Sequence, residues 1–114
     1  MKINGEGYEV HYEESLALIT FKGKFRLRGH EYAPINQLLE QASAASTPLI
    51  TLDVRELHFL NSSGINTLSK FVITVRKLER SNILVKGSAD MPWQKKSLRN
   101  LQKLKPDLVL ELVE

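Results

Sequence analysis

Two adjacent serines, Ser62 and Ser63, are the residues of this chain whose type and position could do chemistry. They stand in the stretch FLNSSGINTL, between an apolar segment and a long run with helical periodicity. A serine hydroxyl at a helix start can cap the helix or accept a phosphoryl group. No His and acid pair is evident near Ser63, so a serine hydrolase is not indicated. From the residues alone, the helix cap and the functional serine both remain open.

No other residues form a recognisable catalytic or metal-binding pattern. His11, His30 and His58 are scattered and lack metal-ligand spacing. The chain has no cysteine, which excludes a disulfide, a thiolate metal site and a cysteine nucleophile. No Gly-rich phosphate loop is present. We therefore expect no enzymatic activity and no cofactor or metal.

Length and composition indicate one ordinary globular domain over residues 1–114. The chain is 42% hydrophobic and 25% charged. Its net charge of +3 is too small to indicate nucleic acid as a partner. No apolar run approaches the roughly 20 residues that a membrane span needs, and the N-terminus is polar. We therefore expect a cytoplasmic protein, without a signal peptide, that binds neither nucleic acid nor membrane.

Hydrophobic periodicity divides the chain into alternating strands and helices. Strands are expected at 8–12, 16–22, 49–54, 83–86 and 108–112, and helices at 32–45, from the serines to about Arg80, and at 92–104. The first two strands should form an antiparallel hairpin. The apolar run 49–54 is typical of a strand covered on both faces.

The predicted fold is α/β, with a mostly parallel central sheet, an antiparallel edge hairpin and three main helices. The order of elements is β-β-α-β-α-β-α-β. Functional loops of such sheets gather outside the carboxyl ends of the strands. Two stretches, GKFRLRGH at 23–30 and LNSSG at 60–64, should therefore lie side by side.

The stretch LITLDVRELHFLNSSGINTL, residues 49–68, resembles the central signature of the STAS domain of bacterial anti-sigma-factor antagonists. That signature is an apolar strand ending in Asp, a short apolar turn, and Asp-Ser-Ser-Gly opening a helix. The resemblance covers about residues 8–113, including the order of elements and Gly23. It implies a single STAS-like domain and a non-enzymatic regulator in a bacterial partner-switching system.

The resemblance also implies roles for individual residues. In this family a kinase, often the anti-sigma factor itself, phosphorylates the serine before the glycine, and a serine phosphatase reverses the step. The unphosphorylated form binds the partner. By position the phosphate acceptor is Ser63. The expected partner-binding residues lie in the two loops and at the helix start: Arg26, Arg28, Asn61, Ser62, Gly64 and Thr67.

Two departures from the family pattern concern charge. Asn61 takes the place of the Asp, which keeps a helix cap but removes a carboxylate. Arg26 stands near the place where many antagonists carry an acidic residue. We therefore consider that the partner presents acidic groups, or that Arg26 or Arg28 pairs with phosphoserine 63. The alternative is a solvated turn whose charges only aid solubility.

Two further interpretations stay open. The domain could be a constitutive STAS-like adaptor that is never phosphorylated. Alternatively, the helix at 92–104 could bind a polyanion weakly, because Lys95, Arg99 and Lys103 share one face. Such a basic face is also typical of an ordinary solvated helix.

Overall fold

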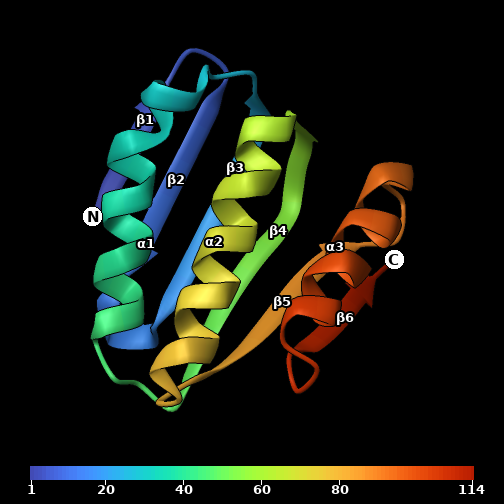
Figure 1. The fold of residues 1–114 in the computed structure, drawn as a ribbon. Coiled ribbons are helices and arrows are strands. Elements are labelled where there is room, and N and C mark those ends of the chain that lie inside the picture. Colours follow the sequence, from blue (N-terminus) through green and yellow to red (C-terminus); the bar gives the residue numbers. More distant parts are fainter.

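The computed structural model describes residues 1–114 as one six-stranded sheet with helices on one side (Figure 1). The elements in chain order are β1 (Lys2–Gly5), β2 (Tyr8–Glu13), η1 (Glu14–Leu16), β3 (Leu18–Phe25), η2 (Gly29–Tyr32), α1 (Ala33–Ala44), β4 (Leu49–Leu60), α2 (Ser62–Leu78), β5 (Asn82–Ser88), α3 (Pro92–Leu104) and β6 (Val109–Val113). The strands lie side by side in the order of the sequence. The predicted α/β fold with three main helices is confirmed.

Strands β1, β2 and β3 are antiparallel, whereas β3 to β6 are parallel. The predicted edge hairpin is therefore a three-stranded antiparallel edge. Strand β1 was not predicted from the sequence, because its four residues include a single apolar side chain, Ile3. The register places Ile3 opposite Val10 of β2.

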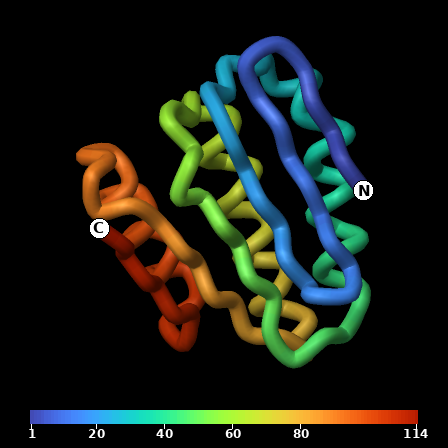
Figure 2. Tube along the Cα trace, turned by 180° about the vertical axis from the view of Figure 1, so that it is seen from behind, coloured from blue at the N-terminus to red at the C-terminus, as the bar shows by residue number.

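All three α-helices cover the same face of the sheet, as the front and back views show (Figures 1 and 2). The reason is the handedness of the connections. Each parallel crossover is expected to be right-handed and each moves one strand in the same direction, so the helices fall on one side. The expectation that the strand at 49–54 is covered on both faces is wrong. Its residues alternate between buried and more exposed positions.

The core fills the space between the sheet and the helices. Its fully buried side chains include Phe21, Leu52 and Val85 from the strands and Ile35, Val72 and Leu98 from the helices. Strand side chains alternate between the two faces, so every second residue faces the helices. The apolar residues of α2 that recur at helical spacing are buried at Leu68, Phe71, Val72 and Val75, whereas Ile65 is half-buried and Leu78 is 38% exposed.

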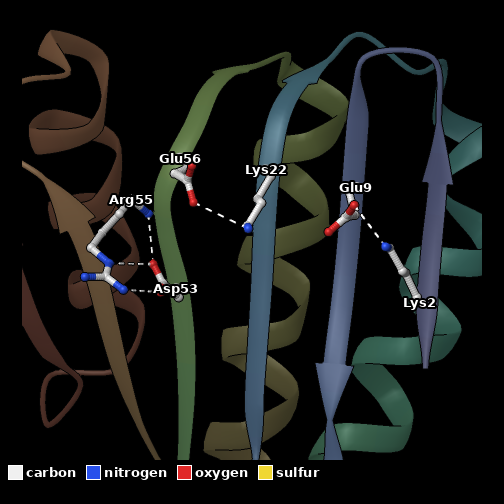
Figure 3. A network of polar contacts seen from close by, with 6 residues as sticks. All are labelled: Lys2, Glu9, Lys22, Asp53, Arg55 and Glu56. Atoms are coloured by element: carbon white, nitrogen blue, oxygen red, sulfur yellow. Dashed lines mark hydrogen bonds and ion pairs between the residues drawn. The ribbon is translucent and has the colours of Figure 1, made fainter.

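The uncovered face of the sheet carries paired charges (Figure 3). Lys2 lies 3.3 Å from Glu9, and Lys22 lies 3.6 Å from Glu56. Asp53 accepts hydrogen bonds from the backbone and the side chain of Arg55. Burial raises the pKa of the Asp53 carboxyl, but the bonds from Arg55 outweigh it and hold the pKa below its usual range. These charges are satisfied among themselves.

Strand β4 is longer than predicted and extends beyond the end of its pairing with β5. Its pairing with β5 ends at Asp53, whereas its pairing with β3 continues to Leu60. Gln94 of α3 closes the resulting gap. Its Nε2 donates to the carbonyls of Val54 (2.7 Å) and Leu57 (2.9 Å). Its Oε1 accepts from the N–H of Ser88 on β5 (2.8 Å). We call these three bonds the Gln94 bridge. They fix the end of β4 that leads into α2.

Candidate functional site

Asn61, not a serine, caps α2. Its Oδ1 accepts from the N–H of Gly64 (3.0 Å) and from the hydroxyl of Tyr32 (2.7 Å). Ser62 and Ser63 are the first two residues of the helix, and neither hydroxyl takes part in the capping bond. The cap role that the sequence left open for the serines therefore belongs to Asn61. Neither serine hydroxyl is therefore needed to cap the helix.

The amide of Asn61 makes a further bond that an Asp side chain could not make. Its Nδ2 donates to the carbonyl of Leu27 (2.7 Å), and its backbone N–H donates to the carbonyl of Phe25 (3.2 Å). A carboxylate at pH 7 has no donor for the Leu27 carbonyl. Asn61 thus joins the loop after β3 to the start of α2. The expectation that residues 23–30 and 60–64 lie side by side is confirmed.

Tyr32 and Gly64 pack tightly beneath the helix start. Tyr32 is only 1% exposed, and burial raises the pKa of its hydroxyl to about 12. A Cβ on Gly64 would lie 2.6 Å from that hydroxyl and would also strike Leu60. Gly64 is therefore required by packing. Thr67 is 7% exposed, and its hydroxyl donates to the carbonyl of Ser63 (3.0 Å). Gly64 and Thr67 shape the site more than they offer surface to a partner.

Ser63 opens into a shallow polar pocket of about 230 Å³ between α1 and α2. We call it the Ser63 pocket, lined by Gly29, Asn36, Ser63, Asn66, Thr67 and Lys70. Ser63 is half-buried and Ser62 is exposed. A Cβ placed on Gly29 would lie 4.0 Å from the Ser63 hydroxyl oxygen, so the loop before α1 forms one wall.

The arginines lie outside this pocket. The guanidinium of Arg26 stacks over the ring of Phe59, 5.0 Å from its centroid. Arg28 is exposed, and its backbone N–H donates to the Glu31 carboxylate (2.8 Å). The cation that lines the pocket with Ser63 is Lys70. Lys70 was not predicted as a site residue, although the spacing of Ser63, Asn66 and Lys70 places them on one helical face.

The basic face of α3 is present in the structure. Lys95, Arg99 and Lys103 are exposed, as expected. Lys105 differs, because it is 5% exposed and its ammonium group lies 2.7 Å from the carboxylate of Asp107. Its charge is therefore neutralised within the fold.

No group of three or more His, Cys, Asp or Glu side chains is arranged to hold a metal ion. None of the helices is both long enough and apolar enough to cross a bilayer.

The strand order and the single layer of helices give a STAS-like α/β fold, and solved structures share it. An anti-sigma factor antagonist from Mycobacterium paratuberculosis has a TM-score of 0.61 at 19% identity, covering 99% of this chain and 84% of that one. The resemblance to this class is thus confirmed at the level of the fold. No protein-family model and no curated protein sequence matches the chain.

Two structures that contain SiaC from Pseudomonas aeruginosa are also similar. A chain in the complex of the diguanylate cyclase SiaD with its activator SiaC has a TM-score of 0.75 at 12% identity, covering 98% of this chain and 97% of that one. A second structure, of SiaC, has a TM-score of 0.71 at 10% identity, covering 99% of this chain and 96% of that one. At such identities the likeness concerns the fold.

Proposed function

We propose that this chain is a non-enzymatic regulator whose binding to a protein partner is controlled by reversible phosphorylation of Ser63. The observation that carries the proposal is the free Ser63 hydroxyl in the first turn of α2, opening into a polar pocket. The similar folds support it, since they include an anti-sigma factor antagonist and a structure of a cyclase with its activator.

The chemistry requires a kinase and a phosphatase as partners. The kinase transfers the γ-phosphoryl group of ATP to the Ser63 oxygen, releasing ADP and the hydroxyl proton. The phosphatase adds water to the phosphoserine and releases inorganic phosphate. A helix start tolerates the new group, because free N–H groups and the helix dipole favour negative charge there.

The docking surface comprises the exposed groups around the start of α2. Ser62, Arg26 and Arg28 are exposed, and Phe59 beneath Arg26 is 39% exposed. Aromatic and Arg side chains are enriched in protein interfaces. A phosphoryl group adds a charge of about −1.5 to −2. A partner packed on this surface would then have to remove water from this charge without supplying a counter-charge of its own, so it dissociates without any change of the fold.

A constitutive adaptor is the second candidate, and Asn61 favours it. The Asp of the family signature is replaced by an amide whose oxygen and nitrogen are both used within the fold. A kinase that reads this carboxylate would not recognise the chain. In that case the same surface binds its partner without regulation.

Affinity capture from the native cells tests the proposal. Wild-type, Ser63→Glu and Ser63→Ala proteins serve as baits, Ser62→Ala is the matched control, and circular dichroism checks their folding. We expect a kinase-like, phosphatase-like or cyclase-like protein on wild type, Ser63→Ala and Ser62→Ala, and its loss on Ser63→Glu. Phosphopeptide mass spectrometry of the endogenous protein should find phosphate on Ser63. Equal capture by all four baits, with no phosphate on Ser63, would establish the adaptor instead.

A further inference from the structure

The Ser63 pocket gathers polar side chains that have no partner in the fold. The side chains of Asn36, Asn66 and Lys70 make no hydrogen bond, although all three line the pocket with Ser63. The four ion pairs of the chain involve other residues, so the ammonium group of Lys70 is unpaired. No carboxylate lines this pocket. The pocket therefore offers donors and a positive charge to an anion.

We propose that this pocket receives the phosphoryl group of phosphoserine 63, with Lys70 as its counter-charge. The inference rests on the proposed function, because it concerns the phosphorylated state of the same serine. It assigns the phosphoryl group a place within this chain, whereas the sequence analysis had considered Arg26 or Arg28 for that role.

The geometry of α2 suits this pairing. Ser63 and Lys70 are seven residues apart, which is two turns and about 10 Å along the helix axis. Helical side chains lean toward the N-terminus, so the long Lys70 side chain extends toward Ser63. Asn66 stands between them on the same face, and Asn36 faces them from α1. Together the ammonium and amide groups supply N–H donors for the three phosphate oxygens.

The surrounding charges leave Lys70 free for this role. Glu40 of α1 shares an adjoining crevice with Lys70 but does not form an ion pair with it. Of the groups before α1, Arg26 is stacked on Phe59 and Glu31 accepts the backbone N–H of Arg28. His30 in η2 is exposed and does not line the pocket. Lys70 is thus the cation placed to interact with the phosphoryl group.

A titration of the phosphoserine itself tests the inference. Phosphoserine is installed at position 63 by genetic encoding, and its second pKa, ordinarily near 6, is measured by ³¹P NMR. An adjacent cation lowers this pKa because it stabilises the dianion. We expect Lys70→Met to raise the second pKa by about 0.2 to 0.7 unit, the range that corresponds to a surface ion pair. Lys70→Arg should keep the low value.

Lys77→Met is the matched control, because it removes the same charge from the same helix. Lys77 lies two turns beyond Lys70, about 21 Å from Ser63 along the axis, where salt screens its charge. The control should leave the second pKa unchanged. Equal pKa values for Lys70→Met, Lys77→Met and wild type would overturn the inference. Since the phosphate is installed without a kinase, this result is independent of whether Ser63 is phosphorylated in cells.

Discussion

The starts of α2 and α3 follow parallel neighbouring strands at the same end of the sheet, yet their polar side chains behave differently (Figure 1). At α3, Gln94 is fully buried, and its amide oxygen and nitrogen bond β5 and β4. At α2, Asn61 is equally engaged, but the adjoining Ser63 pocket contains amide and ammonium groups without partners.

The polar groups of Gln94 hold the fold together, whereas those of the Ser63 pocket are free to bind a ligand. A buried polar group without a partner is costly, so the Gln94 bridge is a structural requirement of the gap between β4 and β5. Unpaired groups that remain hydrated, as in the Ser63 pocket, cost the fold little. We expect mutations at the two places to differ in the same way.

Loss of the Gln94 bridge should have the largest effect. Gln94→Ala leaves two carbonyls of β4 and the Ser88 N–H buried without partners. We expect the free energy of unfolding to fall by about 3 kcal/mol. Urea denaturation measures it. Gln41→Ala is the control, since that exposed side chain makes only a long 3.5 Å bond to Glu14, and it should change stability by less than about 0.5 kcal/mol. A loss below about 1 kcal/mol at Gln94 would show that water replaces the bridge.

The buried hydroxyl of Tyr32 should make the stability of the fold fall at alkaline pH. Its folded pKa of about 12 lies above its ordinary value of 10.0, because burial disfavours the charged tyrosinate. The neutral Tyr32 hydroxyl therefore contributes fully to the stability of the fold below pH 10, and this contribution is lost as the pH rises toward 12. Between pH 9 and 11 the loss should be about 1.3 kcal/mol.

Urea midpoints at these two pH values measure the effect. Tyr32→Phe should lose this part of the pH dependence. Tyr12→Phe should keep it and lose only the separate part that comes from Tyr12, whose pKa burial also raises. An unchanged pH dependence in Tyr32→Phe would mean that the hydroxyl is not held neutral by its surroundings.

Restoring the family residue at position 61 should also destabilise the fold. Asn61→Asp keeps the cap but loses the donor to the Leu27 carbonyl, and we expect a cost of about 1 kcal/mol at pH 7. Asn66→Asp makes the same chemical change one turn later, where the side chain has no bond. It should be neutral or slightly stabilising, because the new carboxylate would lie one turn before Lys70 on the same helix. Equal effects of the two substitutions, measured by urea denaturation, would contradict the bonding assigned to Asn61.

Periodicity and motif resemblance predicted most of the fold. The boundaries of α3 follow from the 3.6-residue period, and they were predicted correctly. Strand β1 was not predicted, because it forms by pairing with β2 and its four residues alone carry no strand pattern. That β4 is covered by helices on one face only was not predicted either. A short apolar run does not reveal on which side of the sheet the crossover helices lie.

The candidate site was predicted in outline but not in its contacts. The NSSG motif located the helix start and the two adjoining loops. The bonds of Asn61 to Tyr32 and Leu27, the packing of Gly64 against Tyr32, and the approach of α1 to α2 all depend on long-range contacts. For that reason the sequence analysis singled out Arg26 and Arg28, whereas the pocket contains Lys70.

The smallest effects on stability should come from the Ser63 pocket itself. Asn36→Ala, Asn66→Ala and Lys70→Ala remove side chains that make no hydrogen bond, so each should change the free energy of unfolding by less than about 0.5 kcal/mol. The same urea denaturation that reports on Gln94→Ala measures them. A small loss of stability at these three residues, against a large loss at Gln94, would show that the pocket side chains are not needed for the fold. A loss near 2 kcal/mol at any of the three would mean that its side chain has a structural partner, and the pocket would no longer be free to hold a phosphoryl group.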